Sequence, residues 1–121
     1  MQKLHDYDAV PGCTLYAALN LISGKWKGMI LYHLLRGTRR FNALRRELDG
    51  CSQRMLIKQL RELEEDGLVE RTVYAVVPPR VDYSITAEGR ALEPVLLALR
   101  DWGHEWLSRR DLTARADHLT A

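Results

Sequence analysis

The stretch from Gly50 to Leu68, GCSQRMLIKQLRELEEDGL, constrains this chain most, because it has a helical pattern with a defined start and end. Ser52 suits a helix N-cap, since its hydroxyl can accept a hydrogen bond from an N–H of the first turn. Gly67 suits the left-handed residue that ends many helices. Three leucines recur at helical spacing and form an inward stripe: Leu56, Leu60 and Leu63. We expect a helix between Ser52 and Gly67.

The outward face of this helix is basic and amide-rich in its first half and acidic in its second half. The outward residues of the first half are Gln53, Arg54, Ile57, Lys58 and Arg61, and the acids are Glu62, Glu64, Glu65 and Asp66. Gln can pair with adenine, and Arg or Lys with guanine, so the first half is typical of a major-groove reader. A solvated helix of mixed charge is the alternative, and this helix alone does not decide between them. Ile57 either contacts a thymine methyl or turns partly into the core.

The elements on either side of this helix favour the DNA-binding interpretation. A short helix from about Asn42 to Leu48 and an Asp49-Gly50 turn precede it, which is the order of a helix-turn-helix. After Gly67 the hydrophobic period changes from 3.6 to about 2. Two alternating runs, Leu68–Tyr74 and Val81–Ile85, flank a proline-rich tip that ends in Arg80. We therefore predict a β-hairpin wing directly after the recognition helix.

The remaining elements complete a mainly helical domain. We expect helices from Cys13 or Thr14 to Ser23-Gly24, from about Trp26 to Arg36 and from about Ala87 to Arg109, and a minor strand at Thr38 to Phe41. Pro94 lies inside the last helix and predicts a kink there. The 121 residues suffice for one domain over positions 1–121, with an ordered core at 12–109 and a polar tail at 110–121. The first residues, Met1 to Gly12, are expected to form an irregular arm. The predicted fold class is mainly α (α+β).

Composition excludes several classes of protein. The net charge is only +2, but five arginines precede Glu47 and form a local basic surface: Arg36, Arg39, Arg40, Arg45 and Arg46. The start, MQKLHDYDAV, lacks the apolar core of a signal peptide, and no apolar run reaches the roughly 18 residues of a membrane span. A cytoplasmic protein is therefore expected. The histidines and cysteines lack metal-ligand spacing, so no metal or cofactor is predicted. No nucleophile-elbow or phosphate-loop motif occurs, and an enzyme is not favoured.

The chain resembles the HxlR-type winged helix-turn-helix regulators of bacteria, which are relatives of the MarR type. The motifs that carry the resemblance are LISGKWKGMILYHLLRGTRRFNALRREL, SQRMLIKQLRELEEDGLVERTVY, VPPRVDYSITAEGRALEPVL and the helix around Trp102. The resemblance covers roughly Cys13 to Leu107. It implies a DNA-binding transcriptional regulator that acts as a homodimer. It also implies that the hairpin at Pro78-Pro79-Arg80 touches the flanking minor groove or the DNA backbone. The chain departs from the family at Cys51, where an aliphatic residue is usual, and at Ile57, where a polar residue is more common.

Two surfaces follow from these patterns. The expected DNA contacts are Arg39, Arg40, Ser52, Gln53, Arg54, Ile57, Lys58, Arg61 and Arg80. The expected dimer interface comprises Leu15, Leu92, Val95, Leu96, Leu99, Trp102 and Trp106. One small wing domain cannot bury the whole apolar seam of the last helix, so two-fold pairing is expected. Such a dimer would place two recognition helices about one duplex turn apart, roughly 34 Å, or a multiple of it, on a near-palindromic operator in double-stranded DNA.

The two cysteines suggest that the protein responds to oxidation of its thiols. Cys13 and Cys51 each lie at a predicted helix start, where the positive end of the helix dipole favours a thiolate. Some members of the family use a cysteine near the start of the first helix as a thiol sensor, and Cys13 stands at that position. We expect a thiol switch in which Cys13 of one subunit bridges to Cys51 of the other, or else two ordinary residues in a reducing cytosol. Two further alternatives stay open: a regulator switched by a small apolar effector in the dimer crevice, and a winged-helix protein-interaction module without DNA binding.

Overall fold

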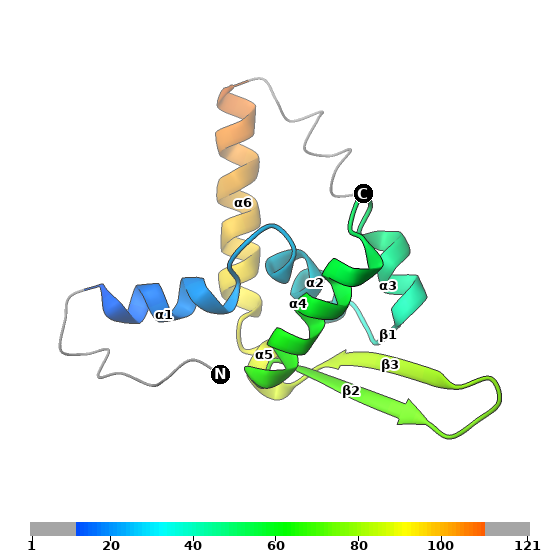
Figure 1. Ribbon diagram of the computed structural model, residues 1–121. Helices are drawn as coiled ribbons and strands as arrows, with labels where there is room; N and C mark the ends of the chain where they lie inside the picture. Colours follow the sequence, from blue (N-terminus) through cyan, green and yellow to red (C-terminus); the bar gives the residue numbers. More distant parts are fainter. Residues whose placement is uncertain (1–11, 111–121) are drawn as a thin grey trace.

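The computed structural model describes residues 12–110, and the expected N-terminal arm and the tail beyond Arg110 lie outside them. These residues form six helices and three strands (Figure 1). In chain order they are α1 (Cys13–Leu21), α2 (Lys27–Leu35), β1 (Arg39–Arg40), α3 (Phe41–Glu47), α4 (Gln53–Glu65), β2 (Val69–Tyr74), β3 (Arg80–Ile85), α5 (Ala87–Arg90) and α6 (Glu93–Arg109). The fold is the predicted mainly α winged helix-turn-helix.

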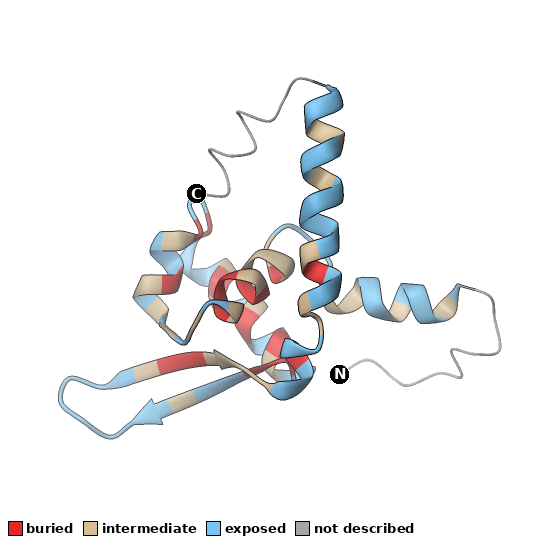
Figure 2. Cartoon of the chain, turned by 180° about the vertical axis from the view of Figure 1, so that it is seen from behind, coloured by how far each residue is buried: buried red, intermediate tan, exposed pale blue. Residues whose placement is uncertain are grey.

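The core lies where α2, α3 and α4 meet, and α2 occupies its centre. Its fully buried side chains are aliphatic: Ile30, Leu31 and Leu34 from α2, Leu44 and Leu48 from the α3 region, and Leu56, Leu60 and Leu63 from α4. The predicted inward stripe of α4 is therefore confirmed. Figure 2 shows the buried residues gathered in this centre, while the wing tip and most of α6 are exposed.

The wing is part of a three-stranded antiparallel sheet in the order β1-β3-β2. The predicted hairpin is confirmed as β2 and β3, with Val69 opposite Ile85 and Tyr74 opposite Arg80. The predicted minor strand is β1, whose Arg39 and Arg40 lie opposite Tyr83 and Asp82. This pairing joins the start of the helix-turn-helix to the base of the wing.

Hydroxyl caps fix both ends of the segment that contains α4 and the wing. The Ser52 hydroxyl accepts a hydrogen bond from the Met55 N–H at 3.1 Å, as predicted. The Thr86 hydroxyl accepts from the Gly89 N–H at 3.0 Å and donates to the Gly67 carbonyl at 2.6 Å. A Cβ at Gly89 would collide with the carbonyl oxygen of Leu68, so α5 packs closely against the end of α4. These contacts make the recognition helix and the wing base one unit.

The single helix predicted from Ala87 to Arg109 is wrong, because the chain forms two helices that are separated at Ala91 and Leu92. Pro94 lies in the first turn of α6. The missing N–H of a proline removes no helical hydrogen bond there, so the predicted kink is replaced by a helix start. In Figure 1, α6 then extends away from the core.

The first helix also extends away from the core, and α1 has no buried residue. Leu15 and Leu19 are exposed, at 63% and 50%, whereas Leu21 at the end of the helix packs against the core. Within residues 12–110, every helix is too short or too polar to cross a lipid bilayer.

Candidate nucleic-acid interface

The outward face of α4 is open at its N-terminal half. Ser52, Gln53, Arg54, Lys58 and Arg61 are exposed, and together with their neighbours they line a shallow hollow on the surface. Within residues 12–110, no acid lies within salt-bridge distance of the three cations on this face: Arg54, Lys58 and Arg61. The face therefore offers amide and cationic donors to a ligand.

Ile57 lies on the edge of this hollow and is half-buried. It is neither a core residue nor a fully solvated one, so it keeps an apolar surface beside the polar donors. The half-burial agrees with the alternative that Ile57 turns partly into the core, and its exposed part is available for the expected contact with a thymine methyl.

Two acids in the second half of α4 pair with cations of the protein, whereas Glu65 and Asp66 are exposed. The Lys27 ammonium on α2 lies 2.8 Å from the Glu62 carboxylate, and Arg71 on β2 lies 3.4 Å from Glu64. The hydrogen bond from Lys27 lowers the pKa of Glu62. The Lys27 side chain is only 9% exposed, so its charge serves this ion pair rather than the outer surface. These ion pairs anchor α4 to α2 and β2, and they neutralise carboxylates that would otherwise repel phosphates.

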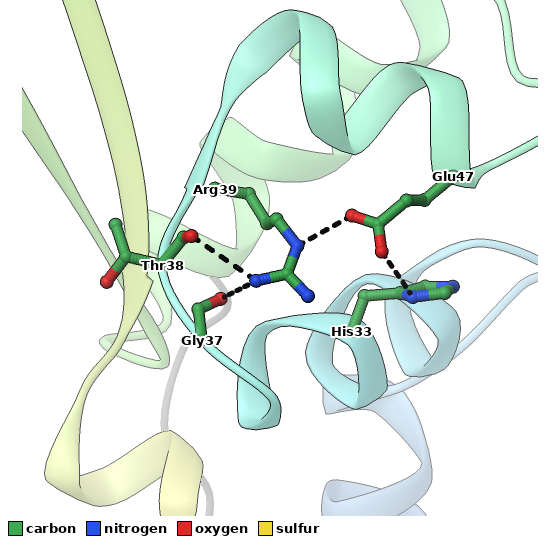
Figure 3. Close-up of polar contacts among 5 residues, drawn as sticks. All are labelled: His33, Gly37, Thr38, Arg39 and Glu47. Carbon is green, nitrogen blue, oxygen red and sulfur yellow. Dashed lines mark hydrogen bonds and ion pairs between the residues drawn. The ribbon is translucent and has the colours of Figure 1, made fainter.

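Arg39 is held by its own domain (Figure 3). Its Nε donates to Glu47 Oε1 at 2.7 Å, and its Nη1 donates to the carbonyls of Gly37 and Thr38 at 2.9 and 3.3 Å. This guanidinium joins the turn after α2 to the end of α3, so its donors face the protein rather than solvent. We therefore keep the exposed Arg40, and not Arg39, in the candidate interface.

His33 lies on the other side of the same carboxylate (Figure 3). Its Nδ1 is 3.4 Å from Glu47 Oε2 and forms no hydrogen bond. Burial lowers the pKa of His33, and the attraction of Glu47 only partly offsets this effect. A neutral imidazole forms no ion pair with Glu47. Arg39 is then the cation that neutralises this carboxylate.

Arg80 lies at the start of β3 and has an internal partner. Its Nε and Nη2 donate to the two carboxylate oxygens of Asp82 at 3.0 and 2.9 Å. Its guanidinium also lies over the ring of Tyr74, 5.1 Å from the centroid. The mutual hydrogen bonds raise the pKa of Arg80 and lower the pKa of Asp82. The positive charge of Arg80, in the strand pair next to the wing tip, is therefore paired with a carboxylate of its own strand.

The two cysteines lie in different environments. Cys13 is half-buried at the first position of α1, and Cys51 is buried directly before the Ser52 cap. Burial raises the pKa of the Cys51 thiol, although Arg45 and Lys25 act in the opposite direction. The prediction that the helix start favours a thiolate at Cys51 is therefore wrong, because desolvation outweighs the nearby positive charge. Both thiols are free in this structure.

The predicted dimer residues divide into three groups. Leu15, Val95, Leu99 and Trp102 are exposed, and Leu92 and Trp106 are half-buried. Leu96 is only 7% exposed and belongs to the core of its own protomer, so its expected place in the seam is corrected. The sequence analysis omitted Tyr16, which is 55% exposed beside Leu15 and enlarges the apolar surface on α1. The position of Tyr16 next to Leu15 and near Leu19 on one short helix could have indicated this apolar surface from the sequence.

A cleft between α2 and α6 was also missed. Met29, Tyr32, Leu99, Arg100 and His104 are among its lining residues. Arg100 donates to the Tyr32 hydroxyl at 3.3 Å and joins the two helices. This cleft lies within one protomer, whereas the small-effector alternative expected a crevice between two protomers. No group of three or more His, Cys, Asp and Glu side chains that could hold a metal ion occurs within residues 12–110.

Comparison with known proteins identifies the family. The family model described as HxlR-like helix-turn-helix matches residues 21–111. The HTH-type transcriptional regulator YdeP of Bacillus subtilis (strain 168) is 51% identical over 104 residues, which cover 86% of this chain and 81% of YdeP. The redox regulator HypR in its reduced form is 48% identical, with a TM-score of 0.75, over 84% of this chain and 98% of HypR. Its oxidized form is 50% identical, with a TM-score of 0.73, over 77% and 96%. The chain therefore belongs to the HxlR-like helix-turn-helix family.

Proposed function

We propose that this protein is a transcriptional regulator that binds double-stranded DNA sequence-specifically as a homodimer. The observation that carries this proposal is that, within the described residues, Arg54, Lys58 and Arg61 form no salt bridge, whereas Glu62 and Glu64 of the second half of α4 pair with Lys27 and Arg71. The relatives support it, because YdeP is named a transcriptional regulator and HypR a redox regulator. Those names describe a non-enzymatic role.

Each residue on the α4 face has a distinct part in this proposal. Gln53 and Arg54 stand in the first turn, where a recognition helix contacts base edges, and they pair with adenine and guanine. Ile57 contacts a thymine methyl. Lys58 and Arg61 lie further along the same face, where they bind phosphate and fix the register of the helix.

The exposed apolar surfaces of α1 and α6 support dimerisation. Leu15 is 63% exposed, Leu99 is 48% exposed and Trp102 is 59% exposed, and all three lie on helices that extend away from the core. A second copy that covers these side chains would remove them from water. Two-fold symmetry then presents two α4 helices to a near-palindromic operator.

The experiment that tests this function is selection of bound duplexes from a random pool, followed by affinity measurements at several salt concentrations. We expect enrichment of a two-fold symmetric motif, and an affinity that falls steeply as salt rises because counterions are released. An interaction module without DNA binding would enrich no motif. A monomeric mass in sedimentation at micromolar concentration would contradict the homodimer.

Thiol-based redox regulation is a second candidate function, favoured by the similarity to HypR in both redox forms. Cys13 is the more accessible thiol, so hydrogen peroxide oxidises it first to a sulfenic acid and is itself reduced to water. The thiol of Cys51 in the other subunit then attacks that sulfur, which forms a disulfide and releases a second water. The raised pKa of the buried Cys51 makes it the slower partner.

Non-reducing electrophoresis after mild peroxide treatment tests this switch. A covalent dimer that is lost in both Cys13→Ser and Cys51→Ser supports the pair. Unchanged DNA affinity after oxidation, with no covalent dimer, would contradict it. That result would leave the α2–α6 cleft as the remaining site for a signal molecule.

A further inference from the structure

One apolar side chain lies within the polar outward face of α4. Ile57 follows Gln53 by four residues and precedes Arg61 by four, so it lies on the same side of the helix as both. It is half-buried and borders the hollow that these donors line. Arg54 and Lys58, on the same face, are exposed. A ligand that fits this face therefore meets cationic and amide donors together with one apolar contact.

The other half-buried apolar residue that lines the hollow, Met55, has partners in the fold. Met55 packs against the hydrophobic core, and its sulfur accepts a hydrogen bond from the Gln59 amide at 3.3 Å. The inward positions of the helix belong to fully buried leucines: Leu56, Leu60 and Leu63. The exposed part of Ile57 borders the hollow, where a ligand can contact it.

The base edges in the major groove of DNA offer one apolar group to such a side chain. Guanine presents two acceptors, adenine an acceptor and a donor, and cytosine a donor, whereas thymine presents an acceptor and the C5-methyl group. 5-Methylcytosine carries the same methyl group at the same ring carbon. The side chain of an isoleucine has no hydrogen-bonding group, so it cannot distinguish the thymine carbonyl from the cytosine amine. Ile57 is therefore suited to recognise the methyl group on either base.

The charges around Ile57 favour duplex DNA over a protein or an RNA partner. In the part of the chain that the structure describes, Arg54, Lys58 and Arg61 form no salt bridge, so a partner has to bring negative charge to both sides of one apolar contact. A methylated base edge between two phosphate backbones combines these features. Duplex RNA does not, because uracil has no C5-methyl group and the major groove of an A-form helix is too narrow for side chains to read.

We propose that Ile57 binds the C5-methyl group of a pyrimidine in the operator, and that 5-methylcytosine can therefore replace thymine at that base pair. This inference rests on the proposed DNA-binding function and extends it. Methylation of an operator cytosine then changes the affinity for DNA without any change in the protein. Burial of one methyl group corresponds to a change in affinity of about fourfold at each half-site.

Deoxyuridine in place of thymine tests the contact, because it removes the C5-methyl group and keeps the base pair. Each thymine of the selected duplex is replaced in turn, and fluorescence anisotropy measures the affinity of the parent protein. We expect a loss of about fourfold at one position of each half-site and little change at the other thymines. The salt slope should stay unchanged, since no cation is removed. The protein is unaltered in this test, so a folding defect cannot produce the result.

A second set of duplexes separates thymine from methylated cytosine as the source of the methyl group. A C·G pair replaces the sensitive T·A pair, and its cytosine is either unmodified or methylated at C5. The parent should bind the methylated duplex about fourfold more tightly than the unmodified one. A 5-methylcytosine placed outside both half-sites is the control, and it should leave the affinity unchanged.

Ile57→Ala should lose both responses to the methyl group, and Met55→Ala is its matched control. Each variant shortens a half-buried apolar side chain of α4 that lines the hollow. Ile57→Ala should bind thymine and deoxyuridine duplexes equally, and methylated and unmodified cytosine duplexes equally. Met55→Ala should keep the affinity ratios of the parent, although it removes a contact with the core. Thermal unfolding checks that both variants are folded at the temperature of the binding measurements.

Four results would overturn the methyl contact at Ile57. Equal affinity of the parent for every deoxyuridine duplex and for the unmodified duplex would show that no methyl group is contacted. A loss with deoxyuridine without a gain from 5-methylcytosine would show that the methylated base cannot replace thymine. A response that survives in Ile57→Ala would assign the contact to another residue, and a response that is also lost in Met55→Ala would assign it to the helix as a whole. No binding of any duplex by the parent would overturn the proposed function as well, which keeps the two failures distinguishable.

Discussion

The cations of the α4 face and those near β1 and β3 look alike in the sequence, but they have different surroundings in the fold. Arg54, Lys58 and Arg61 form no salt bridge within the described residues, whereas Arg39 is bound to Glu47 and Arg80 to Asp82. We expect a cationic side chain to bind DNA well only if it is not already paired with an acidic side chain of the protein. In this domain, the positions of Asp and Glu side chains therefore decide which Arg and Lys side chains can contact a phosphate or a guanine.

The largest effect should come from Arg54→Ala. The side chain is exposed, so the fold should be unaffected, and the affinity for the selected duplex should fall by on the order of 1–3 kcal/mol with relaxed preference at one base position. Fluorescence anisotropy with selected and random duplexes measures both effects. Arg90→Ala, an exposed arginine on α5 by the other end of α4, is the control. Equal losses on both kinds of duplex would make Arg54 a phosphate contact.

Glu62→Gln should weaken the anchor of α4 while it keeps the three cations of the outward face: Arg54, Lys58 and Arg61. It leaves the buried Lys27 ammonium without its ion-pair partner, and we expect a loss of about 1–2 kcal/mol in the free energy of unfolding. This lies below the roughly 3–5 kcal/mol of a fully buried pair, since Glu62 is 38% exposed. Urea unfolding at pH 7 measures the loss. Glu65→Gln, at an exposed carboxylate on the same helix, should change little.

The same ion pair predicts a dependence on pH. Lys27 lowers the pKa of Glu62 in the folded protein. The contribution of Glu62 is therefore fully present above the pKa of an unfolded glutamate, about 4.3, and is lost as the pH falls through the lower folded value. Unfolding measured from pH 6 to pH 3 should show a shallower loss of stability in Glu62→Gln than in the parent. Parallel curves would show that Glu62 does not titrate in this way.

Arg39→Ala should reduce stability and leave DNA preference intact. It removes the bonds to Glu47 and to two carbonyls from a side chain that is 22% exposed, so we expect a loss of about 1 kcal/mol in the free energy of unfolding. Thermal unfolding measures this loss, and anisotropy measures the ratio of selected to random affinity. A changed ratio with unchanged stability would return Arg39 to the DNA surface.

The smallest effect should come from Arg80→Ala. Because Asp82 already neutralises this guanidinium, the salt slope of DNA binding should change by clearly less than the 0.9 expected for one lost phosphate contact. Lys58→Ala, at a cation without a salt bridge on α4, should flatten the slope by about 0.9. Equal changes of the salt slope in the two variants would show that the ion pair with Asp82 does not reduce the contribution of Arg80 to DNA binding.

Much of the fold could be predicted because its signals are local. The leucine spacing of α4, the Ser52 cap and the change of period after Gly67 each act over a few residues, and they correctly placed the helix-turn-helix and the wing. Pro94 shows the limit of such signals. A proline fits either a kink inside a long helix or the first turn of a new one, and the local sequence pattern does not separate the two.

The candidate site was less predictable because it depends on contacts between distant elements. The bond between Lys27 and Glu62 spans α2 and α4, and no periodicity reveals it. The reactivity of Cys51 was misjudged for a similar reason, since the helix dipole is visible in the sequence but the burial that outweighs it is not. The resemblance to the family implied a contact between the wing and DNA, but it could not show that Arg80 is hydrogen-bonded to Asp82.

Photo-cross-linking from the two ends of α4 tests the central account most directly. A benzophenone amino acid replaces either Gln53, in the open N-terminal half, or Glu65, in the acidic half, and each variant is irradiated with the selected duplex. Both positions are exposed, so neither substitution should disturb the core. We predict a covalent protein–DNA adduct from position 53 and little or none from position 65. Equal adducts from both positions, or an adduct from position 65 alone, would contradict a DNA interface at the N-terminal half of α4.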